Sequence, residues 1–489
     1  MEPILPLRLT LPPRSSRLLV RSLHDQLRTA IRDGRLQAGL QLPPTRALAR
    51  ALRISRNSAL AAYDRLLSEG YLVARRGAGT YVADVRSRFH ASPPKHRMRG
   101  HPALRELWRR PPSFFAAENR SYRYNFAMGT PDLANFPFEI WARCARRATR
   151  GLRKADLTRA DPAGRPALRD AIAQHVSFAR AIACEPSDII VTAGAQQAFD
   201  LLARVLVTPR HTLVALEEPC YPPLRHVMQI AGARIATAPV DEEGLVVDRV
   251  SPRARIVCVT PSHQFPFGYP MSLARRDLLL RFAREHRAAV IEDDYDGEYR
   301  FGGGPLDALK TLDHDERVFY VGTFSKSLFP ALRLGYIVTP AWARTALIAA
   351  KALVDGHCSI ETQDTLAAFI AEGHLARHVR KMTRIYAERR TALVAALAEH
   401  GRSLVAPMHS IAGLHISAKL LLPLSAQQIL AKAEHRGLKL QDVSQYSSAR
   451  RPVNALGFGY GAIATHEIDA GIALFADVAR ESGTVARAR

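Results

Sequence analysis

The chain of 489 residues carries 69 lysine and arginine side chains against 45 aspartates and glutamates, a formal net charge of +24, and 47% of its residues are hydrophobic. So much apolar side chain excludes a wholly disordered protein and predicts two to four domains of roughly 100–200 residues each. No stretch approaches the roughly 20 uninterrupted apolar residues of a membrane span. Because no basic amphipathic helix lacks a role in a core, we also expect no membrane partner. Five cysteines without metal-type spacing predict free thiols in a cytoplasmic protein.

The positive charge is concentrated at the N-terminal end. Residues 1–100 hold 19 basic and six acidic side chains. A basic segment beside a large domain is typical of proteins that bind a polyanion, such as nucleic acid or a membrane surface. The alternative is a chain that uses arginine wherever it needs solubility, and composition alone leaves both interpretations open.

Residues 17–84 form one predicted domain. The helical patterns over 21–34 and 55–70 both stop at a glycine, a third covers 43–54, and Ser55 can cap the last helix. We expect that last helix to bury Leu60, Tyr63 and Leu67. The segment YLVARRGAGTYVAD then predicts a strand, a glycine-containing turn and a second strand. Three helices followed by this hairpin predict a winged helix-turn-helix.

The rest of the chain divides into a linker and an α/β domain. Residues 85–121 are rich in arginine, proline, serine and histidine and predict a flexible linker. Over 122–489, short apolar runs alternate with helical patterns, as is typical of a mostly parallel sheet. We expect a large lobe over about 160–360 and a smaller α+β lobe over about 361–489. Strands are expected at 188–194, 212–219, 254–261, 288–294 and 317–324.

The segment VGTFSKSLFPALRLGYIV, residues 321–338, carries a lysine beside hydroxyl groups. Thr323 and Ser325 lie at the end of a predicted strand, Lys326 follows, and Arg333 lies seven residues later. A lysine amine can form a Schiff base with an aldehyde, while hydroxyls and an arginine can hold a phosphate. Together the four favour a phosphorylated aldehyde cofactor, whereas a lone serine–lysine pair would be no evidence.

An acidic segment, VIEDDYDGEYR, places Asp293 and Tyr295 directly after an apolar strand. Ligands of open α/β sheets bind at the carboxyl ends of the strands. An aspartate there can pair with a protonated pyridine nitrogen, and a tyrosine can donate to a phenolic oxygen on the same ring. For this motif alone, the alternative is a solvated acidic loop.

Two further turns follow predicted strands. In VTAGAQQAFDLLARVL, residues 191–206, a glycine-containing turn leads into a helix whose first N–H groups suit a phosphate, although most α/β units have such a turn. In TPSHQFPFGYPMS, residues 260–272, His263 and Gln264 follow a strand end. We expect His263 to be a packed, hydrogen-bonded residue rather than a catalytic one.

Seven strings of the chain resemble a known family. They are GLQLPPTRALARAL, SRNSALAAYDRLLSEGYL, TAGAQQAFDLLARVL, EEPCYPPLR, TPSHQFPFG, VIEDDYDGEYR and GTFSKSLFPALRLGY. Their order and content resemble the MocR subfamily of GntR-type transcription regulators over nearly the full length. The resemblance implies an N-terminal winged helix-turn-helix joined to an α/β, fold-type I aminotransferase-like domain with a smaller C-terminal α+β lobe. The implied cofactor is pyridoxal 5′-phosphate (PLP).

The resemblance also implies roles for the residues of the cofactor site. Lys326 matches the lysine that forms the Schiff base, Asp293 the carboxylate that faces the pyridine nitrogen, and Tyr295 the hydroxyl on the phenolic oxygen. For Tyr221, which matches an aromatic residue beside the ring, the alternative is a half-buried core tyrosine. The phosphate contacts match Thr323, Ser325, Arg333, Gly194, Ala195 and Gln196.

Several positions depart from the family pattern. Arg159 stands where a tyrosine usually reaches the phosphate from the partner subunit, and Ala195 replaces a serine. Ala455 lies where members that sense amino acids have an arginine for the carboxylate, and only Arg450 and Arg451 are near. The class of effector therefore stays open.

The helix over 55–70 is the one expected to enter the major groove of DNA. Arg56 and Asn57 lie at its N-terminal end, where an arginine can bind guanine and an asparagine adenine. The alternative is that these side chains are simply solvated. The other expected contacts, on the preceding helix and the wing, are Thr45, Arg46, Arg75, Arg76 and Gly77.

These inferences predict a PLP-dependent transcription regulator, a homodimer that binds a double-stranded DNA operator and senses an amino compound or PLP itself. We expect at most a slow transamination half-reaction and no metal site. The alternative is an active aminotransferase that carries a DNA-binding domain. A third interpretation, in which the large domain merely dimerises, conflicts with the complete set of residues around Lys326.

Overall fold

The computed structural model describes residues 7, 9–13, 16, 18–75, 77–84, 108, 121–154, 160–302 and 307–487. They belong to two compact units, Met1–Phe115 and Ala116–Arg489. The predicted linker over 85–121 lies almost wholly outside the described residues. Arg76 and Arg159 also lie outside them.

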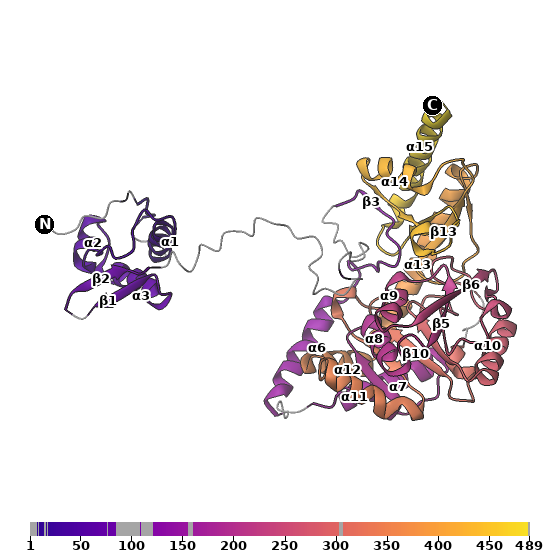
Figure 1. The fold of residues 1–489 in the computed structure, drawn as a ribbon. Coiled ribbons are helices and arrows are strands. Elements are labelled where there is room, and N and C mark those ends of the chain that lie inside the picture. Colours follow the sequence, from indigo (N-terminus) through magenta and orange to yellow (C-terminus); the bar gives the residue numbers. More distant parts are fainter. Residues whose placement is uncertain are drawn as a thin grey trace. The chain divides into compact units, whose positions relative to one another are not determined.

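The N-terminal unit contains three helices and a hairpin (Figure 1). They are α1 (Leu19–Arg32), α2 (Thr45–Ala51), α3 (Arg56–Ser68), β1 (Leu72–Arg75) and β2 (Gly79–Val82). Helix α1 buries Leu23 and Leu27 in the core that it shares with α2 and α3. The Ser55 hydroxyl caps α3 by accepting a hydrogen bond from the Ser58 N–H at 3.0 Å, and β1 pairs antiparallel with β2. The predicted winged helix-turn-helix is confirmed.

The buried face of α3 differs from the predicted one. Leu60 is 44% exposed, and Leu67 is only partly buried. The buried residues are Ala59, Ala62, Tyr63 and Leu66. They follow the i, i+3, i+4, i+7 spacing of a single helix face. The prediction of Leu60 as a core residue was wrong because small alanines, rather than the larger leucines, occupy the face that packs on α1 and α2.

An eight-stranded sheet forms the centre of the larger unit. Its strands in spatial order are β4 (Ile189–Thr192), β11 (Gly335–Val338), β10 (Val318–Thr323), β9 (Ala289–Asp294), β8 (Ile256–Val259), β5 (Leu213–Glu218), β6 (Arg234–Asp241) and β7 (Gly244–Leu245). The run from β10 to β6 is parallel, and β11 is antiparallel to both of its neighbours. All five expected strands are present. The carboxyl ends of β9, β10, β8 and β5 therefore lie along one edge.

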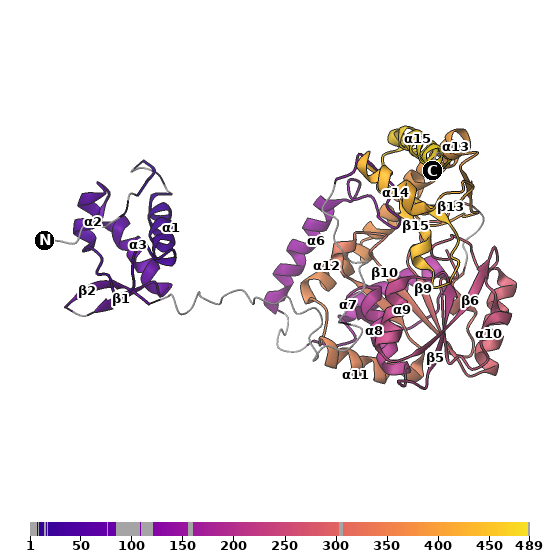
Figure 2. The ribbon, with the colours of Figure 1, turned by 45° about the horizontal axis from the view of Figure 1, so that its top comes forward.

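Helices cover both faces of this sheet (Figure 2). The alternation of a β-strand sends Ile190 to one face and Ile189 and Val191 to the other. Helices α8 (Ala195–Leu206), α9 (Pro222–Ile230) and α11 (Arg344–Val354) pack on the Ile190 side. The opposite side is covered by α7 (Pro166–Arg180), α10 (Leu273–Glu285) and α12 (Ile360–Ala371), with α6 (Phe138–Gly151) packed on α12.

A smaller lobe follows the large sheet. It contains α13 (His374–His400), α14 (Ala426–His435), α15 (Ile468–Arg487) and a sheet in the order β12 (Val405–Pro407), β13 (His415–Leu420), β16 (Ala455–Gly459) and β15 (Gln441–Asp442). The segment before α6 joins this lobe, because β3 (Tyr124–Asn125) pairs with β14 (Leu438–Lys439). In the described ranges, no helix has the length and apolar composition that crossing a membrane requires.

Candidate functional site

The predicted cofactor residues meet at the carboxyl-end edge of the large sheet. Strands β9 and β10 run parallel with Asp293 opposite Val321, so both strands end at this edge. Thr323 ends β10, and Lys326 follows in the next turn. Gly194, which precedes α8, lies against β11, since a Cβ on Gly335 would be 3.0 Å from the Gly194 Cα. The parallel topology thus gathers groups that are up to 139 residues apart in the sequence.

Lys326 places its amine inside the site. Its Nζ donates a hydrogen bond to the carbonyl oxygen of Gly129 at 2.5 Å. Burial lowers the pKa of the Lys326 amine, and the nearby Asp296 and Asp293 carboxylates oppose that shift. A lowered pKa leaves more of the amine neutral and therefore nucleophilic. Sequence reasoning missed Gly129, which lies in a segment without a motif.

The two adjacent aspartates of β9 have different surroundings. The Asp294 carboxylate forms an ion pair with Arg180 Nε at 2.7 Å and accepts a hydrogen bond from the Tyr320 hydroxyl at 2.6 Å. Oδ1 of each aspartate is buried without a hydrogen-bond partner among the described residues, but Asp294 has the ion pair and the hydrogen bond at its other oxygen. Burial, reinforced by neighbouring carboxylates, raises the pKa of Asp293 to about 8. Asp294 is therefore a structural residue, and Asp293 is the carboxylate available to a ligand.

Tyr295 contacts the histidine that follows β8. Its hydroxyl lies 2.9 Å from His263 Nδ1, and the same nitrogen lies 3.1 Å from the Asp296 carboxylate. Burial raises the pKa of Tyr295 well above its ordinary value, so its hydroxyl keeps its proton. His263 is 1% exposed and also contacts the Ser410 hydroxyl through Nε2 at 3.1 Å. His263 therefore has the packed, hydrogen-bonded environment that the sequence predicts.

A turn of backbone N–H groups and an arginine form the remaining part of the site. Gly194 adopts φ +81°, a left-handed conformation that suits glycine, and α8 begins at Ala195. A Cβ at Gly194 would lie 3.1 Å from the Arg333 guanidinium, and Arg333 Nη2 donates to the Ala193 carbonyl at 2.9 Å. The Thr323 hydroxyl donates to Ser325 Oγ at 3.0 Å. The N-terminus of α8, the two hydroxyls and the Arg333 guanidinium together form a suitable binding site for a phosphate.

Tyr221 completes the set. It precedes α9, and its ring stands perpendicular to the Phe265 ring with the centroids 5.8 Å apart. Burial raises the pKa of the Tyr221 hydroxyl to about 12, with Asp293 adding to the shift and Arg333 opposing it. The tyrosine thus lies within electrostatic reach of both the carboxylate and the guanidinium. Tyr221 is partly buried, and its role beside the cofactor ring stays a prediction.

These residues fit PLP. Asp293 offers an unpartnered buried carboxylate to a protonated pyridine nitrogen, and Lys326 offers a buried amine to an aldehyde. The start of α8, Thr323, Ser325 and Arg333 can hold the phosphate, and Gln196 Oε1 is a further buried atom without a partner in the described part of the chain. Ala195 supplies only its backbone N–H, as its side chain has no hydroxyl.

The expected DNA-contacting residues lie on the outer surface of the N-terminal unit. Arg46, Arg56 and Asn57 are exposed, while Thr45 at the start of α2 is partly buried. In the wing, the guanidinium of Arg75 lies 4.8 Å from the Tyr81 ring centre. Gly77 adopts φ +76° at the turn. The structure thus presents Arg46, Arg56, Asn57, Arg75 and Gly77 to solvent, and Arg76 lies outside the described residues.

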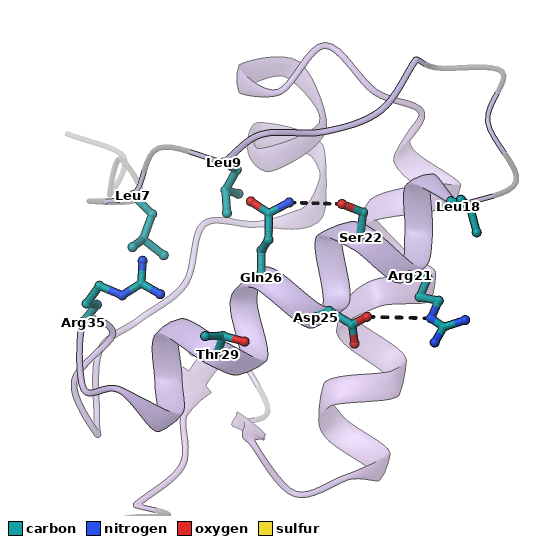
Figure 3. Close-up of a pocket in the computed structure, with 9 residues that line it drawn as sticks. All are labelled: Leu7, Leu9, Leu18, Arg21, Ser22, Asp25, Gln26, Thr29 and Arg35. Atoms are coloured by element: carbon teal, nitrogen blue, oxygen red, sulfur yellow. Dashed lines mark hydrogen bonds and ion pairs between the residues drawn. The ribbon is translucent and has the colours of Figure 1, made fainter. Parts of the chain in front are cut away.

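A hollow of this unit lies elsewhere, between α1 and the segment over residues 7–13 (Figure 3). The Gln26 side chain holds that segment, because its amide accepts from the Thr10 N–H at 2.9 Å and donates to the Thr10 carbonyl at 2.6 Å. No lining residue of the hollow comes from α2, α3 or the described part of the wing. The candidate DNA contacts therefore lie outside this hollow.

Two family models match the chain. The model described as "Bacterial regulatory proteins, gntR family" matches residues 19–82, and "Aminotransferase class I and II" matches residues 124–433. The probable rhizopine catabolism regulatory protein MocR of Rhizobium meliloti is 35% identical, with 91% of this chain and 90% of that protein covered. The chain belongs to the MocR-type regulators of the GntR family.

Further comparisons support both halves of this MocR-type regulator. The pyridoxine biosynthesis regulator PdxR of Corynebacterium glutamicum is 31% identical, with 93% of this chain and 94% of that one covered. Among solved structures, Pyrococcus horikoshii kynurenine aminotransferase has a TM-score of 0.69 and 26% identity, covering 74% of this chain and 92% of its own. LysN of Thermus thermophilus, solved with a phosphopyridoxyl-leucine, has a TM-score of 0.68 and 27% identity, with the same coverage. PLP is the cofactor of this domain.

We expect Asp293→Asn to change how stability depends on pH. Because burial raises the pKa of Asp293 to about 8, the folded cofactor-free protein binds a proton there that an unfolded chain, with a pKa near 3.9, releases. Stability therefore falls as the pH rises from about 4 to 8, and asparagine removes that contribution. As the pH rises, thermal unfolding of the cofactor-free proteins should show a steeper fall of Tm for the wild type than for the variant. The variant should also bind PLP more weakly. Parallel curves would contradict this account of Asp293.

We expect Arg56→Ala to lower DNA affinity by roughly 1–3 kcal/mol at the preferred operator and to relax sequence preference, because the guanidinium at the start of α3 is placed to bind a base. Arg65→Ala is the matched control, since it removes the same charge from the last turn of α3. Binding to selected and random duplexes measures both effects. Equal losses on the two duplexes would make Arg56 a phosphate contact.

Proposed function

We propose that this regulator acts as a cytoplasmic homodimer that senses an amino compound through its PLP site and thereby changes how its winged helices bind DNA. The observation that carries the proposal is the assembly of Lys326, Asp293 and the phosphate-binding groups at one edge of the sheet, in a chain that also has a GntR-type unit. The homodimer would bring two winged helices to a double-stranded operator, as is common for helix-turn-helix proteins.

Each residue of the site has a different role toward PLP. When bound, PLP supplies an aldehyde that reacts with primary amines and a ring that withdraws electrons. Asp293 would balance the charge on the pyridine nitrogen, while Arg333 and the start of α8 would fix the phosphate. Tyr295 keeps its proton because burial raises its pKa, so it can donate a hydrogen bond toward the ring oxygen. The lowered pKa of the Lys326 amine favours exchange with another amine.

The contact between Lys326 and Gly129 offers a route from the site to the rest of the chain. An amine that is free donates to the Gly129 carbonyl, as the 2.5 Å distance shows, whereas an amine engaged with the cofactor has fewer protons to donate. Gly129 follows β3, which pairs with β14 of the smaller lobe. If this contact differs between two conformations of the regulator, an effector that changes the contact binds one conformation more tightly than the other. Such differential affinity is what coupling between effector binding and DNA binding requires.

The proposal is tested by titrating PLP-loaded protein with a panel of primary amines and amino acids. We expect at least one compound to shift the cofactor absorbance and to change DNA affinity, with a coupling of about 5–150-fold. Lys326→Ala is the control that lacks the exchangeable amine. A spectral shift with unchanged affinity for every DNA tested would contradict the coupling, and PLP-loaded protein that binds no DNA would contradict the regulatory function itself.

A further inference from the structure

Helix α6 of the larger unit presents arginines to solvent. Its sequence is FEIWARCARRATRG, and the short turn LRK (Leu152–Lys154) follows it. Cys144 and Ala148 are buried on the side that faces α12. The exposed residues include five arginines, and one of them, Arg147, pairs with Glu372. The other four are Arg143, Arg146 and Arg150 of α6 and Arg153 of the turn, which we call the arginine face of α6. Spacings of three and four residues place them on one side of the helix, and Arg143 to Arg150 span about 10 Å at 1.5 Å per residue.

The carboxylates near this face already have other partners. Helix α12 and the residue after it carry three acidic side chains. The pairs are Glu361 with Thr149, Asp364 with Arg165, and Glu372 with Arg147 and His374. Among the described residues, no carboxylate oxygen lies within 4.0 Å of a guanidinium nitrogen of the arginine face. Even Glu139, one turn before Arg143 on the same helix, forms no ion pair with this face. The charges of this face are therefore left without a neutralising partner in the described part of the chain.

Ordinary helix electrostatics explain only part of this pattern. A cation in the last turn of a helix is favourable by about 0.3–1 kcal/mol, because the C-terminal end of the helix is partially negative. That effect applies to Arg150, in the last turn of α6, but not to Arg143 and Arg146 in its middle. Like charges one turn apart destabilise an isolated helix by several tenths of a kcal/mol. A run of unpaired arginines thus has a cost that an anionic ligand would remove.

We propose that the arginine face of α6 binds the phosphate backbone of the same DNA that the winged helix contacts. The proposal rests on the proposed function, which supplies the polyanion. Duplex DNA carries one charge per about 1.7 Å of its axis, so a 10 Å row of guanidinium groups faces several phosphates at once. Such contacts add affinity and fix orientation without selecting a sequence. The aminotransferase-like unit is then part of the DNA-binding surface, as well as the sensor.

The test compares two double variants of the full-length, PLP-loaded protein. Arg146→Ala/Arg150→Ala removes two charges from the arginine face. Arg281→Ala/Arg284→Ala removes two from α10, where each arginine faces an aspartate, Asp277 at 2.8 Å and Asp315 at 3.6 Å. Helices α6 and α10 lie at opposite sides of the unit in both views (Figures 1 and 2). Affinity for a long random-sequence duplex is measured over a series of salt concentrations, and the measurement is repeated on a duplex of roughly two helical turns.

We expect the α6 variant to lower the magnitude of the slope of log K against log salt by about 0.9 for each phosphate that its arginines no longer neutralise, while the α10 variant keeps the wild-type slope. The effect should shrink on the short duplex, which the winged helix alone can cover.

An unchanged slope for the α6 variant on long DNA would overturn the proposal. A change in oligomeric state by light scattering, with the slope unchanged, would assign the face to an interface between copies. Loss of DNA binding by Arg56→Ala with wild-type behaviour of the α6 variant would overturn this inference and leave the proposed function intact.

Discussion

Replacing Lys326 by alanine should abolish the covalent attachment of PLP. The Lys326 amine is buried in the site, where its charge acts on the Asp293 carboxylate, and burial lowers its pKa. Without it the phosphate and ring contacts remain, so the variant should still bind the cofactor, but weakly and reversibly. Borohydride reduction followed by mass spectrometry should find PLP bound to the wild type and absent from the variant. The absorbance of the linked cofactor should disappear at the same time.

A matched control separates loss of the amine from loss of the fold. Lys381 lies exposed on α13, away from the motifs of the site, so Lys381→Ala should retain the adduct in full. Circular dichroism of both variants checks that each is folded. If Lys326→Ala still traps PLP at the wild-type level, then another amine forms the bond and the assignment of Lys326 is wrong.

The choice between neighbouring carboxylates shows what the sequence could and could not predict. The motif VIEDDYDGEYR identifies the right strand end, and the family resemblance selects Asp293. The physical reason for that selection lies in α7, where Arg180 neutralises Asp294 from 114 residues away. Nothing in the local pattern marks Arg180 as the partner. The Gly129 carbonyl is a similar case, because a backbone oxygen has no sequence signature.

The same contrast holds for the fold. The five expected strands are apolar runs buried on both faces, such as β10, in which all six residues are buried. Strand β6 is not among the expected strands, because most of its residues are partly or fully exposed and it lacks such a run. In α3, the pattern of leucines indicates a face that is displaced from the true one, since alanines form the contact. Apolar runs thus predict five strands of the sheet, but they miss the buried β11, the more exposed β6 and the small residues that pack α3.

The chain lacks the arginine that would bind a substrate carboxylate, and this absence bears on transamination. Full transamination requires a substrate whose Cα–H bond stands perpendicular to the cofactor ring, and a bidentate arginine on the carboxylate would supply that orientation. Ala455 occupies the position expected for this arginine and is buried in a cluster with Phe267, Tyr269, Met408 and Val443. Arg450 and Arg451 are both exposed. The position expected to bind the substrate carboxylate therefore has an apolar environment and no cation.

We accordingly expect amino compounds to change the PLP spectrum while steady-state transamination stays far below the roughly 1–10³ s⁻¹ that is typical of enzymes. The Lys326 amine, once released by an incoming amine, can still accept a proton, so a slow half-reaction is allowed. Production of keto acid by PLP-loaded protein, with several amino donors and acceptors, measures the rate. Ala455→Arg is the informative variant, because it restores a guanidinium at the position of the missing one and should raise the half-reaction rate for amino acids more than for simple amines. Turnover by the wild type within the enzymatic range would instead favour an active aminotransferase that carries a DNA-binding domain.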